Sequence, residues 1–288
     1  MDPSWSHERH FYAASMNGIN AGLLRSELLA PQGPYTAVDV VASTGSTNAD
    51  LREAAVGGAA DRTVLIAEEQ TAGVGRRARR WVSPRGSGVY LSVLLRPAGV
   101  PFSGLGSLAV VAGLAVTDLA RELGVEAALK WPNDVLAGPD RGKCAGILSE
   151  AVAGDELAVV LGIGLNVRPL GPGVEAGAGG LPPTSLAEQG ARTTDRTAVT
   201  ALLLAALADR EDRWRAAGGD LERAGLLDDY RERCETTGQE VRVILPGDNT
   251  IVGTAEDVDA TGGLAVRDKD GRRHTVFAGD VVHLRPVR

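Results

Sequence analysis

Hydrophobic positions along the chain fall mainly into short continuous runs separated by turn-forming residues. Runs of four to eight apolar residues bounded by Gly, Pro, Asn or Asp predict buried strands. The expected strands of the larger part of the chain are Val38–Ala42, Thr63–Ala67, Gly88–Leu95, Ala127–Trp131, Val135–Ala137, Lys143–Ala153 and Glu156–Val167. Short turns join the last four, so we expect them to form an antiparallel meander.

Longer apolar stretches with helical spacing lie between and after these strands. Leu105–Leu123 is rich in alanine and bounded by Gly104 and Gly124, which predicts a long helix. A shorter helix should begin at Thr47, with Asp50 completing a capping arrangement. Two more are expected over 197–217 and 221–235. The pattern therefore predicts an α+β fold with a mixed, mainly antiparallel sheet.

The pattern changes after Gly238, where only short strands separated by turns are expected. These are Glu240–Leu245, Thr250–Val258, Leu264–Arg267, His274–Ala278 and Val281–Leu284. Strands of this length and spacing are typical of a small antiparallel barrel. We therefore expect three parts: an irregular or partly helical extension over 1–35, a main domain over 36–235, and a small β domain over 236–288.

Composition narrows the class of protein. The chain has 288 residues, a formal net charge of −7 and two cysteines, which argues against a disulfide framework and favours a reducing cytoplasm. No apolar run was expected to approach the roughly 18 residues of a membrane helix, and the N-terminus lacks a signal-peptide pattern. The four histidines have no metal-ligand spacing. An acidic chain is a poor general binder of nucleic acid.

One loop departs from this acidic character. Gln70-Thr-Ala-Gly-Val-Gly-Arg-Arg-Ala-Arg-Arg-Trp81 places four arginines within five residues, directly after two glycines. Glycine allows the backbone to approach a ligand closely, and arginine offers a fork of donors to carboxylate and phosphate oxygens. The loop therefore predicts an anion site, although a solvated basic patch would have the same composition.

Two further motifs place charged residues beside apolar strands. Lys130-Trp-Pro-Asn-Asp134 puts opposite charges on either side of a tight turn. In Gly142-Lys-Cys-Ala-Gly-Ile-Leu148, Lys143 opens an apolar strand, where an ammonium group is costly unless it meets an anion or water. Neighbours in a strand point to opposite faces, so Cys144 should not share the face of Lys143.

These motifs resemble those of biotin protein ligases. Ser46-Thr-Asn48, Gln70 with its Gly/Arg loop, the two lysine motifs and Gly162-Ile-Gly-Leu-Asn166 occur in the order and rough spacing of that family. The resemblance runs from about residue 36 to residue 288. It implies a catalytic domain related to class II aminoacyl-tRNA synthetases, followed by an SH3-like β-barrel.

The resemblance also implies an activity. Biotin and ATP would form biotinyl-5′-AMP with Mg²⁺, and biotin would then pass to a lysine of a biotin carboxyl carrier domain of acetyl-CoA, acyl-CoA or pyruvate carboxylase. Neither step needs an enzyme nucleophile. Mg²⁺ would bridge the phosphates while keeping several waters, so no dedicated all-protein metal site is expected. A cytoplasmic monomer or weak homodimer that binds neither DNA nor a membrane is implied. About 35 residues precede the first catalytic strand, without a convincing pair of amphipathic helices for a DNA-binding domain.

The resemblance assigns roles to individual positions. For biotin binding these are Ser46, Thr47, Asn48, Gln70, Gly73, Val74, Gly75, Arg76 and Lys143. For ATP or adenylate binding they are Arg76, Arg79, Trp81, Lys130, Asn133, Asp134, Lys143 and Asn166. Catalysis is expected to depend on Lys143, Arg76, Arg79 and Asp134. Val74 and Ala78 depart from the family pattern, which has arginine and commonly glycine there.

Two alternatives share parts of this pattern. A lipoate ligase or octanoyltransferase has the same catalytic fold, and the Gln70 loop and small β domain favour biotin over it. A non-enzymatic sensor of biotinyl-adenylate that regulates transcription is the other alternative, and it would need a DNA-binding part.

Overall fold

The fold is described from a computed structural model, which describes residues 18–82, 84–154, 156–171, 174, 176, 180–247, 249–277 and 279–284. Parts of several expected segments lie outside these ranges. They include residues 1–17 of the N-terminal extension, six residues of the segment 171–183, which is rich in Gly and Pro and expected to be a loop, residue 278 at the end of an expected strand, and residues 285–288 of the small β domain.

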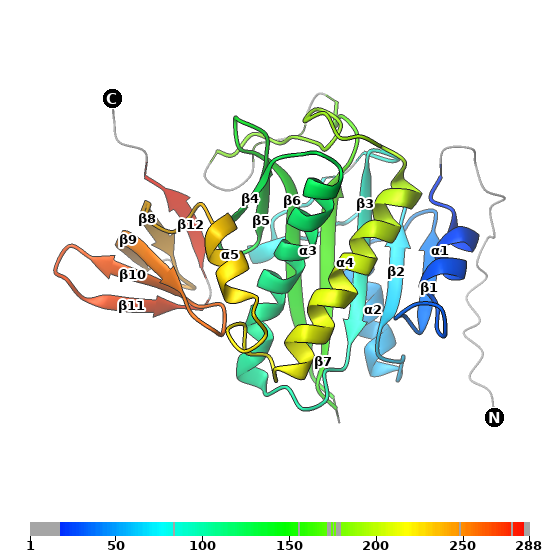
Figure 1. Cartoon of the computed structure of the whole chain (residues 1–288), viewed down its shortest axis with the longest axis horizontal. Coiled ribbons are helices and arrows are strands. Elements are labelled where there is room, and N and C mark those ends of the chain that lie inside the picture. Colours follow the sequence, from blue (N-terminus) through cyan, green and yellow to red (C-terminus); the bar gives the residue numbers. More distant parts are fainter. Residues whose placement is uncertain are drawn as a thin grey trace.

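A seven-stranded sheet forms the centre of the molecule (Figure 1). Its strands are β1 (Ala37–Val41), β2 (Thr63–Ala67), β3 (Gly88–Leu95), β4 (Ala127–Lys130), β5 (Asp134–Ala137), β6 (Gly142–Val152) and β7 (Ala158–Asn166). The spatial order is β1-β2-β3-β7-β6-β5-β4. Only the β1–β2 pair is parallel among these neighbours. The expected mixed, mainly antiparallel sheet is therefore confirmed.

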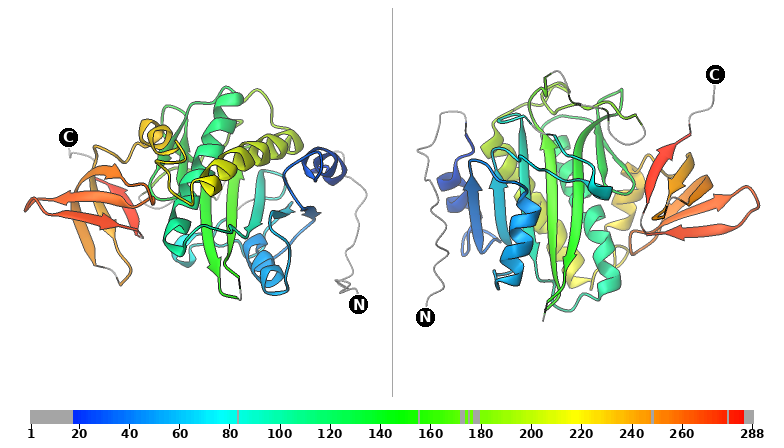
Figure 2. Two further views of the ribbon diagram at one scale, coloured as in Figure 1. Left: turned by 60° about the horizontal axis from the view of Figure 1, so that its bottom comes forward. Right: turned by 180° about the vertical axis from the view of Figure 1, so that it is seen from behind.

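Helices cover both faces of this sheet. The two long helices α3 (Leu108–Glu122) and α4 (Arg196–Ala216) lie side by side on one face, and α2 (Thr47–Val56) lies on the other (Figure 2). Every residue of β3 is buried as a result, which explains why Ser92 alone interrupts its apolar side chains between Val89 and Leu95. Helix α1 (Ala21–Leu28) packs against β1, where Arg25 Nε donates to the Val38 carbonyl at 2.8 Å.

The helical segment Phe102–Glu122 is long and apolar enough to cross a membrane by length and composition, with a mean hydropathy of 1.6. The expectation that no apolar run approaches the length of a membrane helix is wrong for this segment. Ser and Thr residues interrupt its apolar positions, so it does not stand out as one continuous run in the sequence. Thr117 Oγ1, for example, donates to the Leu114 carbonyl at 2.9 Å and is thereby compatible with burial. Since 72% of its 18-residue window is buried within the protein, we interpret it as a core helix.

The C-terminal part forms a second, five-stranded antiparallel sheet. Its strands are β8 (Glu240–Ile244), β9 (Thr250–Val258), β10 (Leu264–Asp268), β11 (Arg273–Val276) and β12 (Asp280–His283), in the order β11-β10-β9-β8-β12. The expected small antiparallel unit is confirmed. Within the described residues its edge strands β11 and β12 do not pair, so the sheet is open where a closed barrel was expected.

The turn between β4 and β5 joins the two sheets. Trp131, which is only 1% exposed, donates from Nε1 to the Gly262 carbonyl at 2.9 Å, and its backbone N–H donates to Thr236 Oγ1 at 3.0 Å. Lys130 Nζ donates to the carbonyl of Val281 in β12 at 2.7 Å. The Lys-Trp-Pro-Asn-Asp motif thus lies at the edge of the main sheet and also contacts the C-terminal part.

One helix cap and one helix boundary differ from the expected ones. Ser46, and not Thr47, is the N-cap of α2, because its side chain accepts the Ala49 N–H. The helix expected over 221–235 is reduced to α5 (Leu227–Arg233). Gly225 adopts a φ of 64°, and this left-handed residue separates a preceding turn from the helix.

Replacing Trp131 with phenylalanine should lower the free energy of unfolding by about 1–3 kcal/mol, since the Gly262 carbonyl loses its donor where the two sheets meet. Urea unfolding followed by circular dichroism measures this change. The control is Phe102→Leu, at a side chain that is 71% exposed, which should shift the value by less than about 0.5 kcal/mol. An equal effect of both substitutions would show that the Trp131 contact does not stabilise the junction.

Candidate active site

A cavity lies on the main sheet between the start of α2, the Gly/Arg loop and strands β6 and β7. Its empty volume, part of it open to solvent, is about 430 Å³. The lining residues are Ser46, Thr47, Asn48, Gln70, Val74, Gly75, Trp81, Leu91, Asn133, Gly146, Ile147, Leu148, Gly162, Ile163 and Gly164. Polar and apolar groups both face it, which is typical of small-molecule sites.

The start of α2 supplies hydrogen-bonding groups to one end of the cavity. Gln70 Oε1 accepts from the Thr47 N–H at 2.9 Å and lies 3.1 Å from Thr47 Oγ1. Asn48 Nδ2 donates to Glu150 Oε2 at 2.7 Å. Ser46 both caps the helix and lines the cavity, so the structural and the binding interpretations are compatible for this residue.

Three glycines in β6 and β7 make the floor of the cavity. A Cβ on Gly162 would lie 2.1 Å from Asn48 Oδ1. Cβ atoms on Gly146 and Gly164 would lie 2.9 Å and 2.5 Å from the Trp81 ring. Side chains at these positions would therefore fill the space that Asn48 and Trp81 use.

Only part of the Gly/Arg loop reaches the cavity. Val74 and Gly75 line it, and Gly73 is buried next to Gln70 and Trp81. The short helical turn Arg76–Ala78 follows, in which Arg77 and Ala78 have φ values of 54° and 56°. A non-glycine residue in this region is strained, so the loop holds a conformation that its neighbours must stabilise.

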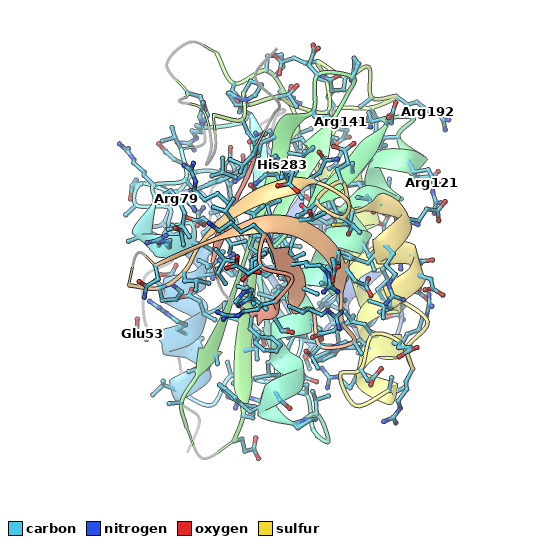
Figure 3. All side chains as sticks on the ribbon, turned by 90° about the vertical axis from the view of Figure 1, so that its left-hand side faces the viewer. Glu53, Arg79, Arg121, Arg141, Arg192 and His283 are labelled. Carbon is cyan, nitrogen blue, oxygen red and sulfur yellow. The ribbon has the colours of Figure 1, made fainter. Side chains whose placement is uncertain are left out.

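The loop arginines differ in their surroundings. Arg79 Nη2 is ion-paired with Asp280 Oδ1 of β12 at 2.6 Å, and it lies beside the C-terminal strands (Figure 3). Arg77 Nη1 lies 3.6 Å from the same carboxylate. Burial lowers the pKa of Arg76, while the charges of Asp280 and Asp134 oppose this effect. A guanidinium remains cationic at neutral pH, so Arg76 is a buried positive charge near the site.

The two motif lysines form separate interactions. Lys143 Nζ is 2.6 Å from Asp134 Oδ1 and 5.4 Å from the centroid of the Trp81 ring. Lys130 contacts Val281 of the second sheet, although it pairs with Asp134 in the β4–β5 register. Burial lowers the pKa of Lys130, and the Asp134 carboxylate is the main opposing influence. Asp134 therefore lies between two ammonium groups, and Lys143 is its ion-pair partner.

The two asparagines expected near the nucleotide are placed differently. Asn133 lines the cavity and donates from Nδ2 to the Ile147 carbonyl at 2.8 Å. Asn166 is only 3% exposed and does not line it; its Nδ2 donates to the Thr184 carbonyl at 3.0 Å.

Three buried polar atoms around the cavity lack a hydrogen-bond partner among the described residues. They are Arg76 Nη1, Trp81 Nε1 and Asn166 Oδ1. Buried polar atoms are normally paired because an unpaired one costs free energy. All three belong to residues that the resemblance assigns to ATP or adenylate. Arg76 Nη1 and Trp81 Nε1 are donors that an anionic ligand could satisfy, whereas Asn166 Oδ1 is an acceptor and would need an N–H or O–H group.

The described residues contain no group of three or more His, Cys, Asp and Glu side chains that could hold a metal ion. Asp134 is the carboxylate that the resemblance places in the site, and it is already paired with Lys143. The residues that line the cavity are neutral, polar or apolar, and the ion pair of Lys143 with Asp134 lies outside this lining.

Eight of the expected residues line the cavity, namely Ser46, Thr47, Asn48, Gln70, Val74, Gly75, Trp81 and Asn133. The four expected to be catalytic, Lys143, Arg76, Arg79 and Asp134, do not line it. Three further residues that contact the expected ones were missed. Glu150 and Ser92 contact Asn48, and Asp280 contacts Arg79. Glu150 follows Lys143 on β6 at a separation of seven residues, so an acidic residue inside an apolar strand was the available signal. Asp280 lies 201 residues from Arg79 and gave none.

Comparisons with known proteins agree with this geometry. Residues 40–166 match the model of the biotin/lipoate A/B protein ligase family, and residues 236–284 match that of the biotin protein ligase C terminal domain. A biotin--[acetyl-CoA-carboxylase] ligase of Mycobacterium tuberculosis is 45% identical over 267 residues, which are 91% of this chain and 94% of that protein. The corresponding ligase of Paracoccus denitrificans is 35% identical, over 81% of this chain and 95% of that protein.

A solved structure is similar to most of this chain. Biotin protein ligase from Aquifex aeolicus in complex with biotin and ATP superposes with a TM-score of 0.70 at 26% identity, covering 87% of this chain and 100% of that one. The similarity therefore includes both sheets and is not confined to one motif. This chain belongs to the biotin protein ligase family.

Proposed function

We propose that this protein is an ATP-dependent ligase that attaches biotin to a lysine of a carrier protein. In the first step an oxygen of the biotin carboxylate attacks the α-phosphorus of ATP, and pyrophosphate leaves. In the second step the lysine amine attacks the acyl carbonyl of biotinyl-5′-AMP, an amide forms, and AMP leaves with the electron pair of the broken bond. The amine loses a proton in this step.

The observation that carries the proposal is the arrangement of polar groups around one cavity. Ser46, Thr47, Asn48 and Gln70 gather at one end, where hydroxyls and amides match the N–H and C=O groups of a ureido ring. Lys143 and Arg76 do not line the cavity, but Lys143 lies 5.4 Å from the ring of Trp81 and Arg76 directly follows Gly75, and both of these neighbours line it. Positive charge is therefore close to the cavity, where the carboxylate and phosphate of biotinyl-5′-AMP would need it.

Catalysis in this proposal depends on positioning and on neutralising charge. Asp134 holds the Lys143 ammonium beside the indole of Trp81, so the cation is ordered before the ligand arrives. Preorganised cations cost little reorganisation when charge develops on the transferring oxygens. The biotin and nucleotide residues named from the family resemblance remain proposals, and Arg79 joins them only if it leaves Asp280.

Magnesium would enter with ATP. It takes oxygen ligands, keeps several waters and binds chiefly to substrate phosphates in nucleotide sites. The site fits this role, since Asp134 is its carboxylate and the described residues offer no closed cage. Magnesium would neutralise phosphate charge, while Lys143 and Arg76 orient the oxygens that react.

The relatives named above support acetyl-CoA carboxylase as the source of the carrier domain. We keep pyruvate carboxylase as a second acceptor, and a cytoplasmic monomer or weak homodimer as the working state. The division at residues 36–235 and 236–288 is likewise proposed; the two separate sheets support it. A role without DNA is supported by the net charge of −7. A binding assay at low salt tests it.

The lipoate alternative is the main competitor, because the family matched by residues 40–166 includes lipoate ligases. The match of residues 236–284 to a biotin protein ligase domain favours biotin. A thermal-shift comparison of biotin with lipoate discriminates the two, and stabilisation by lipoate alone would favour the competitor.

Incubation with biotin, MgATP and a purified carrier domain tests the function. We expect pyrophosphate release and the addition of one biotinyl group to the carrier, detected by intact mass. A reaction lacking ATP is the control. If the folded protein yields neither product, the ligase proposal is wrong.

Replacing Lys143 with alanine should slow adenylate formation by roughly tenfold to a few hundredfold, because a charge-assisted contact is worth about 1.5–3 kcal/mol. Single-turnover pyrophosphate release measures this rate. Lys269→Ala, at an exposed lysine, is the matched control. The substitution also leaves the buried Asp134 without its partner, so stability should be recorded alongside. An unchanged rate would restrict Lys143 to a structural ion pair.

The thiol of Cys144 should not take part in the reaction. It is fully buried, its Sγ lies 3.5 Å from the Val135 carbonyl, and burial raises its pKa to about 12. At pH 8, well below this value, the group is a protonated thiol and a poor nucleophile. Cys144→Ser should therefore retain adenylation and transfer within about threefold.

Alkylation by iodoacetamide at pH 8 provides a second test of the same group. Peptide mass analysis should find Cys144 unmodified in the folded protein and modified in urea, where its pKa returns to about 8.5. Rapid alkylation of the folded chain, or loss of transfer by a stable Cys144→Ser variant, would favour an acyl-thioester mechanism.

A further inference from the structure

The carboxylate of Glu150 on β6 reaches the polar end of the cavity through another side chain. It does not line the cavity, and no role in this family was assigned to it from the sequence. We infer that Glu150 is a positioning residue for biotin, which acts through Asn48 and Ser92 to make the Thr47 hydroxyl an acceptor. This inference rests on the proposed function, in which Thr47 binds the ureido ring.

The first step is the orientation of the Asn48 amide. Asn48 Nδ2 donates to Glu150 Oε2 at 2.7 Å and lies 3.3 Å from the Leu148 carbonyl. A carboxylate and a backbone carbonyl can only accept hydrogen bonds, so the NH₂ group must face β6. Asn48 Oδ1 consequently faces Ser92, and it too can only accept.

The second step concerns the single proton of Ser92. Its Oγ lies 2.6 Å from Asn48 Oδ1 and 2.7 Å from Thr47 Oγ1. One hydroxyl proton serves one acceptor at a time, and Asn48 Oδ1 has no proton to give in return. The Ser92 proton therefore goes to Asn48, which leaves a lone pair of Ser92 Oγ facing Thr47.

The third step reaches the cavity wall. The hydroxyl proton of Thr47 can go to Ser92 Oγ at 2.7 Å or to Gln70 Oε1 at 3.1 Å. Once Ser92 donates to Asn48, the shorter contact needs the Thr47 proton, since two oxygens at that distance repel without one. Thr47 then offers only lone pairs to the cavity, and it accepts an N–H of the ligand.

This arrangement of hydrogen-bond donors matters because the groups that form it are buried. Ser92, Thr47 and Asn48 are 0%, 3% and 7% exposed, so water does not readily replace a lost donor or acceptor. Gly162 packs against Asn48 so closely that a Cβ there would clash with Oδ1. The amide is therefore held from both sides, and only one donor pattern satisfies the whole chain of groups.

The test compares biotin binding by isothermal titration and steady-state kinetics in the full chain. Glu150→Ala should raise the Kd and the KM for biotin by about tenfold, the equivalent of one charge-assisted hydrogen bond, with the KM for ATP unchanged. Glu150→Gln keeps an acceptor oxygen and should remain within about threefold of wild type. The matched control is Glu53→Ala, which removes a carboxylate from the exposed face of α2 (Figure 3) and should change neither constant.

A second variant covers the case in which Glu150→Ala does not fold. Ser92→Ala removes the proton between Asn48 and Thr47 and leaves Glu150 in place, so it should weaken biotin binding to a similar extent. If wild type binds biotin and both variants bind it equally well, or if the KM for ATP rises in parallel, the positioning role is overturned. If wild type itself fails to bind biotin, the proposed function falls, and this inference falls with it.

Discussion

The site depends on the absence of side chains at three positions of two long, fully paired strands. Gly146, Gly162 and Gly164 project nothing above the sheet, and the space above them holds the Asn48 amide and the Trp81 ring. Glycine within a strand weakens it by roughly 0.5–1 kcal/mol relative to alanine. Strands β6 and β7 offset that cost through continuous antiparallel pairing from Ala145–Leu165 to Val152–Ala158. The floor of the cavity is thus formed by two continuously paired strands.

The charged side chains near this cavity are held in place by contacts within the protein before any ligand binds. Asp134 pairs with Lys143, Asp280 pairs with Arg79, and Lys130 is anchored on a backbone carbonyl. Arg76 keeps one buried nitrogen without a partner among the described residues. Near the proposed position of an acyl phosphate, the positive side chains therefore outnumber the carboxylates that pair with them. A site that binds an anion requires such an excess of positive charge.

Hydrophobic runs were sufficient to predict the strands of the main sheet, since each buried run is short and bounded by turn residues. They could not predict that Gly225 would separate a turn from α5, because this depends on its left-handed backbone conformation. They also could not predict that Thr117 would be buried within α3, because this depends on a local hydrogen bond. The gathering of Ser46–Asn48 with Gln70 was anticipated through the family resemblance. Glu150, Ser92 and Asp280 were not, because their contacts span 102, 44 and 201 residues and leave no local pattern.

The ties between β12 and the main sheet have a consequence for biosynthesis. The carboxylate that pairs with Arg79 and the carbonyl that accepts from Lys130 belong to Asp280 and Val281, which leave the ribosome after every strand of the main sheet. Domains generally fold from the N-terminus as the chain emerges. The main sheet can therefore form while translation continues, with Lys130 still lacking its acceptor and the Gly/Arg loop its anchor. A nascent chain should therefore contain the cavity well before it contains the ordered charges, and it would become competent only after β12 has emerged.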